Sequence, residues 1–113
     1  MHNQNAQVQY QLAQMNKNFA NLKINNINNQ EIRYGEGHRY VGQVVNGMRE
    51  GKGIYYWNDG ERYEGDYRND KSEGKGIYYY NDGNRKMGDW KDDKEIGKHV
   101  ILYKNGEVKT VNY

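Results

Sequence analysis

The sequence predicts a mainly β protein: a single-layer, elongated antiparallel β-meander of about seven strands, preceded by one N-terminal amphipathic helix. The first observation is a fixed period, because Gly42, Gly65 and Gly88 are spaced 23 residues apart. The second is a pair of turn signals rich in Asn, Asp and Gly in every period, and the third is the alternation of aromatic and charged residues between these turns. A period of this length is typical of repeat proteins in which each unit packs on its neighbours.

Composition and charge narrow the function classes of this chain of 113 residues. The formal net charge is only +2, and 17 basic residues are mixed with 15 acidic ones, so the clustered cations that nucleic-acid phosphates require are missing. There is no cysteine to form a disulfide or a thiolate zinc site. No apolar run approaches the roughly 20 residues of a membrane span, nor is there a secretory signal. We expect an intracellular protein that binds no nucleic acid.

Residues 1–30 form an Asn/Gln-rich segment with no acidic residue. Within it, apolar residues at steps of four and three predict an amphipathic helix over about residues 6–23. The apolar stripe consists of Val8, Leu12, Met15, Phe19 and Leu22. An isolated helix this short is marginally stable in water, so the stripe is expected to pack on the protein's own sheet or on a partner. A disordered tail and a mitochondrial transit peptide remain open as alternatives.

Residues 31–113 are predicted to form the repeat sheet. We divide them into a half repeat at 31–38, full repeats at 39–61, 62–84 and 85–107, and a terminal half unit at 108–113. Each full repeat has one turn signal inside it, at 46–47, 69–70 and 92–93, and a second one at its end. Asn, Asp and Gly tolerate the positive φ of tight hairpin turns, so each full repeat is predicted to be one β-hairpin.

One face of the predicted sheet carries aromatic residues and glycines, because Tyr63, Gly65 and Tyr67 have the same strand parity. We expect aromatic rings to lie flat across glycines of neighbouring strands, where no Cβ obstructs them. The candidate partner-binding residues of this aromatic trough are Tyr40, Tyr55, Trp57, Tyr63, Tyr67, Tyr78, Tyr80 and Trp90. Two interpretations stay open: the trough binds a partner helix or extended peptide, or it only holds the sheet together.

The opposite face is also apolar by strand parity. Its residues are Ile54, Tyr56, Ile77, Tyr79, Val100 and Leu102. We expect either the N-terminal apolar stripe or a partner protein to cover this face, since an exposed patch of this kind favours docking or aggregation. The alternative is that these are strand-favouring residues left partly exposed.

Catalytic chemistry finds little support in the sequence. Ser72 is the only serine and Thr110 the only threonine, and neither has a histidine at a suggestive spacing. The acid pair Asp92–Asp93 fits a hairpin tip. Gly35-Glu36-Gly37 precedes a strand, whereas a phosphate-binding loop needs a helix N-terminus. The twelve-residue calcium-loop pattern is absent. We expect no enzyme, no cofactor, no metal and no small-molecule substrate.

The segment Tyr63-Glu64-Gly65-Asp66-Tyr67, followed by Gly74-Lys75-Gly76-Ile77-Tyr78-Tyr79-Tyr80-Asn81-Asp82-Gly83, resembles the MORN repeat (membrane occupation and recognition nexus). The resemblance extends over about residues 31–107 in three registers. In the third repeat Lys86 replaces the tyrosine and His99 replaces a glycine, so we expect a frayed terminal unit with a capping role.

The resemblance implies a single-layered sheet in a non-catalytic scaffold protein. It favours a protein subunit of a large assembly in the cilium, the axoneme or the cytoskeleton, which is an argument by analogy. Two other functions remain open. Lys17 and Lys23 beside the apolar stripe would permit the weak membrane-surface binding of a peripheral membrane adaptor that binds phosphoinositides. The acid-free N-terminus would suit an accessory subunit of a mitochondrial membrane complex.

Overall fold

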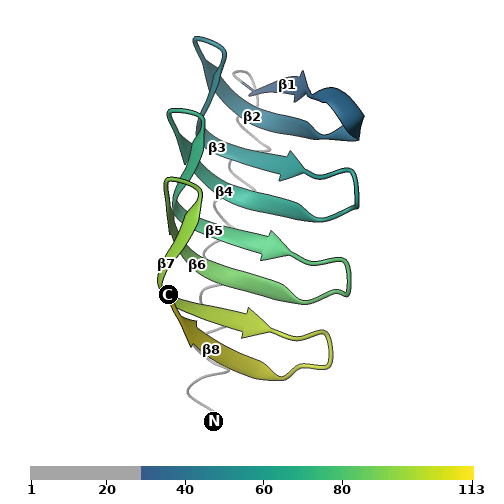
Figure 1. Cartoon of the computed structure of the whole chain (residues 1–113), viewed down its shortest axis with the longest axis vertical. Coiled ribbons are helices and arrows are strands. Elements are labelled where there is room, and N and C mark those ends of the chain that lie inside the picture. The colour runs from purple at the N-terminus through teal and green to yellow at the C-terminus, as the bar shows by residue number, and fades with distance from the viewer. Residues whose placement is uncertain (1–28) are drawn as a thin grey trace.

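A computed structural model describes residues 29–113, which form one open antiparallel sheet of eight strands in chain order (Figure 1). The strands are β1 (Asn29–Arg33), β2 (Arg39–Val45), β3 (Met48–Tyr56), β4 (Arg62–Arg68), β5 (Lys71–Tyr79), β6 (Arg85–Lys91), β7 (Lys94–Leu102) and β8 (Val108–Asn112). The predicted single-layer meander is confirmed, with eight strands instead of about seven. The predicted helix over residues 6–23 lies outside the described residues. Within residues 29–113 the only helical element is a short 3-10 turn, η2 (Gly35–Gly37).

Each predicted hairpin is present, with its tip on one side of the sheet and the connection to the next hairpin on the other (Figure 1). The tips are two-residue turns in which both residues have positive φ, as at Asn69 (51°) and Asp70 (71°). Such turns match the right-handed twist of the flanking strands, and they favour Asn, Asp and Gly. The turn chemistry read from the sequence therefore places the strand boundaries.

A bulge interrupts the pairing in every hairpin, at the same place in the first two and one residue earlier in the third. In the second hairpin Gly65 pairs with Gly76, but Tyr67 already pairs with Ser72, so three residues of β5 face one of β4. Bulges bend a hairpin and increase its twist. Beyond the bulge, the tips of the second and third hairpins hydrogen-bond to the preceding hairpin: the Asp70 amide donates to the Arg49 carbonyl oxygen at 3.0 Å, and the Asp93 amide donates to the Ser72 carbonyl oxygen at 3.1 Å.

The apolar side chains form two clusters, one on each face of the sheet. The aromatic face contains the buried residues Tyr40, Tyr63, Tyr67 and Trp90. The opposite face contains a second cluster, of Ile77, Met87 and Val100, against which Tyr79, Leu102 and Val108 pack. Two clusters on the two faces of one sheet are what the strand parity predicts.

The third repeat is not frayed, so that expectation is wrong. Its strands β6 and β7 contain 7 and 9 residues, the same lengths as β4 and β5. Strand β7 pairs with β6 on one side and with β8 on the other. The reason lies in how His99 packs, described below.

Candidate partner-binding surface

The tyrosine rings of the first two repeats lie across glycines, as predicted. A Cβ added to Gly65 would stand 2.6 Å from Cζ of Tyr63, and the same ring also lies over Gly76 of the next strand. The Tyr63 hydroxyl donates a hydrogen bond to the Asp66 carbonyl oxygen at 3.2 Å. One period earlier, the Tyr40 hydroxyl donates to the Gln43 carbonyl oxygen at 2.8 Å. Each repeat thus uses one ring to cover the site of its bulge.

In the third repeat the imidazole of His99 takes the place of the tyrosine ring. It lies over Gly88, where an added Cβ would be 2.6 Å from the imidazole Cγ. His99 Nε2 is 2.8 Å from the Asp89 carbonyl oxygen, one period beyond the carbonyl that the Tyr63 hydroxyl contacts. A carbonyl oxygen only accepts, so Nε2 carries the proton. The ring has moved from the first strand of the hairpin to the second, which explains why the two departures from the repeat pattern occur together.

These rings belong to a continuous aromatic row of edge-to-face contacts, called the buried row because every ring in it is buried except the last, Tyr113, which is exposed. Successive ring centroids are 5.2, 5.5, 5.2, 4.6 and 4.9 Å apart. The row runs Tyr40, Tyr67, Tyr63, Trp90, His99, Tyr113. Burial raises the pKa of Tyr40, Tyr63 and Tyr67 above the usual tyrosine value, because it disfavours the phenolate. Edge-to-face pairs stabilise a core beyond the area they bury, so this row holds the hairpins together.

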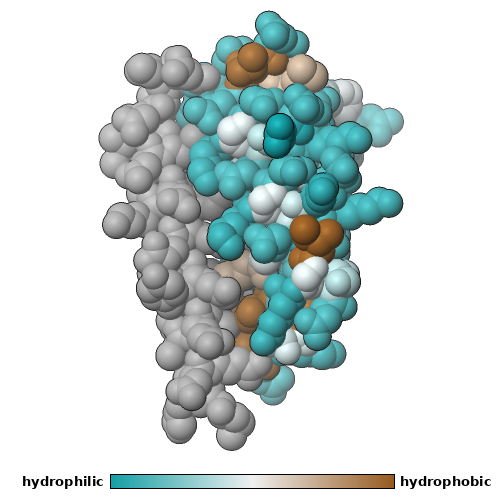
Figure 2. All heavy atoms as spheres, turned by 90° about the vertical axis from the view of Figure 1, so that its left-hand side faces the viewer, coloured by the Kyte–Doolittle hydropathy of each residue, from teal (hydrophilic) through white to brown (hydrophobic). Residues whose placement is uncertain are grey.

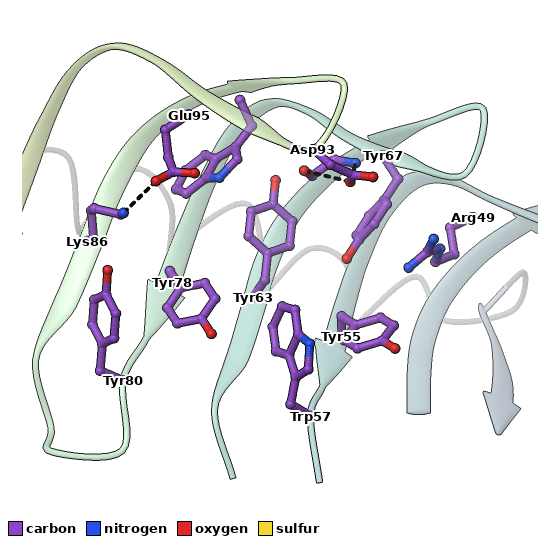
Figure 3. Close-up of a pocket in the computed structure, with 12 residues that line it drawn as sticks. Arg49, Tyr55, Trp57, Tyr63, Tyr67, Tyr78, Tyr80, Lys86, Asp93 and Glu95 are labelled. Carbon is purple, nitrogen blue, oxygen red and sulfur yellow. Dashed lines mark hydrogen bonds and ion pairs between the residues drawn. The ribbon is translucent and has the colours of Figure 1, made fainter. Parts of the chain in front are cut away.

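A second series of rings, the outer aromatic ladder, lies beside the buried row on the same face. Its successive centroids are 5.7, 4.6, 5.3 and 4.8 Å apart. The ladder consists of Tyr34, Tyr55, Trp57, Tyr78 and Tyr80. Its last four rings are half-buried and Tyr34 is exposed, so the ladder offers ring surface that the buried row does not. Figure 3 shows these last four rings side by side along the sheet.

Four rings of the ladder and three of the buried row line an open groove of about 480 Å³ (Figure 3); they are Tyr55, Trp57, Tyr78 and Tyr80, and Tyr63, Tyr67 and Trp90. A cation stands toward each end of it. Arg49 places its guanidinium carbon 5.4 Å from the Tyr55 ring centre, and its Nε is 2.7 Å from Asp70 Oδ1. Lys86 Nζ is 2.9 Å from Glu95 Oε2 and 2.9 Å from the Tyr113 hydroxyl.

The hydrogen bonds that these two cations donate shift the pKa values of charged side chains at the two ends of the groove. The hydrogen bond from the Arg49 side chain lowers the pKa of Asp70, although burial opposes this shift. Burial disfavours the charge on Lys86, but its hydrogen bonds to Tyr113 and Glu95 outweigh this effect and raise its pKa. Both cations are therefore compensated, and the groove has little net charge.

The structure divides the predicted binding residues between the two series. It places Tyr40, Tyr63, Tyr67 and Trp90 in the buried row, and Tyr55, Trp57, Tyr78 and Tyr80 in the ladder. The predicted stripe from Val8 to Leu22 lies outside the described residues. The sequence analysis did not assign Tyr34, Arg49 or Lys86 to the binding surface. The period could have found Tyr34, because it precedes Trp57 by 23 residues.

The side of the sheet that carries the hairpin tips is mostly hydrophilic (Figure 2). Across residues 29–113 no group of three or more His, Asp or Glu side chains is placed to hold a metal ion. That same part of the chain has no helix with the length and apolarity needed to cross a membrane.

The repeated hairpins, the open sheet and the aromatic groove define a hairpin-repeat protein. Residues 40–62 and 63–85 each match the MORN repeat. The chain is a MORN repeat protein, and the resemblance seen in the sequence is confirmed for these two repeats. Proteins of this family are typically non-enzymatic. No curated protein matches the chain.

Proposed function

We propose that this MORN repeat protein is a non-enzymatic scaffold subunit that binds protein partners through its outer aromatic ladder. The observation that carries the proposal is the division of the rings into two series. The buried row already supplies the contacts that hold neighbouring hairpins together. Aromatic residues concentrate binding energy at protein interfaces, and the four ladder rings that line one open groove form a suitable anchor site.

The assembly we favour is ciliary, axonemal or cytoskeletal, on the analogy of other MORN repeat proteins. The predicted stripe of Val8, Leu12, Met15, Phe19 and Leu22 is a second proposed contact, either with a partner or with the sheet. A protein ligand is favoured over a lipid headgroup because the groove cations are compensated by Asp70 and Glu95. A headgroup site would need uncompensated Lys or Arg.

Two neighbouring tyrosines provide a matched test of this function. Tyr55 belongs to the ladder, and Tyr56 lies on the opposite face, where Arg39 stacks over its ring at 4.0 Å. Partners of the tagged full-length protein are quantified in cells for the wild type, Tyr55→Ala and Tyr56→Ala. We expect a defined set of partners to be lost with Tyr55→Ala and retained with Tyr56→Ala, and imaging should place the tagged protein in a cilium or on the cytoskeleton.

Equal retention of every partner by both variants would refute a role for the ladder in docking. Co-sedimentation with phosphoinositide liposomes, lost at high salt, would point instead to the membrane adaptor.

A further inference from the structure

We propose that the outer aromatic ladder binds a proline-rich segment in the polyproline II conformation, which lies along the long axis of the sheet. This inference rests on the proposed docking function and names the chemistry of the partner. It follows from the spacing of the rings, from their tilt and from the hydrogen-bond donors that they present.

The spacing of the ladder rings matches the advance of a polyproline II helix. Neighbouring ring centroids are 4.6 Å apart from Tyr55 to Trp57 and 5.3 Å apart from Trp57 to Tyr78. Equivalent rings of successive repeats therefore lie no more than about 10 Å apart, and two strands at the usual separation span about 9.6 Å. A polyproline II helix has three residues per turn at a rise of about 3.1 Å, so it advances about 9.3 Å per turn. Every third residue of such a segment would meet an equivalent pair of rings.

Other regular segments fit this spacing less well. An α-helix rises about 1.5 Å per residue, so its seven-residue repeat advances about 10.5 Å and drifts out of register by about 1 Å per hairpin. An extended strand repeats its side chains every two residues, about 6.7 Å. The ladder selects for a three-residue repeat.

The rings are also shaped for proline. Planes of neighbouring rings are inclined by 55°, 44° and 52°, so adjacent rings form shallow V-shaped clefts. Grooves lined by aromatic side chains are the usual receptors for proline-rich segments, whose conformation is largely set before binding. The ladder from Tyr34 to Tyr80 spans at most about 20 Å, which corresponds to six or seven residues of polyproline II.

Two hydrogen-bond donors complete the site. Within residues 29–113 neither the indole N–H of Trp57 nor the hydroxyl of Tyr55 takes part in a hydrogen bond. A polyproline II segment has no internal hydrogen bonds, so its carbonyl oxygens are free to accept from these groups. Because the cations of the groove are compensated, the segment needs no charge of its own.

Decaproline is the probe that tests the inference, titrated into full-length protein and followed by tryptophan fluorescence and calorimetry. We expect saturable binding that weakens at least tenfold in Trp57→Ala and several-fold in Tyr55→Phe, which removes only a hydroxyl. Tyr56→Ala, on the opposite face, should bind as the wild type does. A decapeptide with proline at every third position should bind several-fold tighter than one with proline at every fourth.

The comparison ligands are a Gly-Ser decapeptide and an amphipathic helical peptide of apolar and alanine residues. Binding of the helical peptide but not of decaproline, dependent on Trp57, overturns the polyproline inference and leaves the docking function standing. If neither peptide binds and Tyr55→Ala keeps all cellular partners, both proposals fail. Equal binding of decaproline to the wild type and to Trp57→Ala also overturns the inference.

Discussion

The imidazole of His99 lies over Gly88 and makes the contacts that a tyrosine ring makes in the preceding repeat. Tyr63 contacts Tyr67 and Trp90 edge to face at 5.5 and 5.2 Å, and His99 contacts Trp90 and Tyr113 in the same way at 4.6 and 4.9 Å. Lys86 occupies the position of the missing tyrosine and turns toward Glu95. The space above Gly88 holds one ring, which either strand of the hairpin can supply.

This exchange predicts strong coupling between positions 86 and 99. Lys86→Tyr alone should lower the free energy of unfolding by about 1–3 kcal/mol, because two rings compete for the space above Gly88. His99→Gly alone should lower it by about 2–4 kcal/mol, since a buried ring is lost. The double variant restores the arrangement of Tyr63 and Gly76 and should be more stable than either single variant. Urea denaturation of the wild type, the two single variants and the double variant measures the four unfolding free energies of this double-mutant cycle.

Lys86→Met serves as the control, because it removes the ion pair with Glu95 without adding a ring. Its combination with His99→Gly should show no rescue. Additive losses in the Lys86→Tyr and His99→Gly pair would contradict the exchange.

The rings that cross glycines predict which glycines tolerate a side chain. A Cβ on Gly76 would overlap the Tyr63 ring, so Gly76→Ala should cost about 1–3 kcal/mol of unfolding free energy. Gly35 has ordinary φ and no atom within 4 Å of an added Cβ, so Gly35→Ala should change stability by less than about 0.5 kcal/mol. Thermal denaturation followed by circular dichroism compares the two. Equal losses would show that ring packing on glycine does not limit stability.

The two tryptophans should separate folding from binding. Trp90 is 5% exposed in the buried row, so Trp90→Ala should lower the unfolding free energy by about 3–5 kcal/mol. Trp57 is half-buried in the ladder, and Trp57→Ala should cost much less stability while abolishing partner binding. Chemical denaturation and the partner assay are run on both variants. A large loss of stability in Trp57→Ala would place the ladder in the structural core.

Acid should weaken the hairpin tip that Asp70 joins to Arg49. The hydrogen bond from Arg49 lowers the pKa of Asp70 in the folded protein below its value in the unfolded chain. A group of this kind contributes stability that is fully present above its unfolded pKa, near 3.8, and is lost as the pH falls through the lower folded pKa. The unfolding free energy of the wild type should therefore decrease below about pH 4.

Asp70→Asn keeps a residue that tolerates the positive φ of 71° at this turn, but it cannot carry the charge. Its unfolding free energy should depend less on pH in that range than the wild type's does. Identical pH profiles would mean that the Arg49–Asp70 pair does not stabilise the fold.

Much of this fold could be read from the sequence because its determinants are local. The period fixes the repeat, the turn residues at 46–47, 69–70 and 92–93 fix the hairpins, and strand parity assigns Tyr63 and Gly65 to one face. The overlap of rings with glycines followed from the same parity. The eighth strand was less evident, since β1 and β8 each belong to an incomplete unit.

The tertiary structure alone divided the aromatic face into a buried row and an outer ladder. Tyr63 and Tyr78 have the same residue type and face the same way, but only Tyr63 lies across glycines and beneath the neighbouring hairpin's Trp90. His99 was read as a defect because its ring comes from the opposite strand of the hairpin to the tyrosine it replaces. Burial and ring contacts depend on pairing across the bulge and on the next repeat, and the order of residues along a single strand does not contain that information.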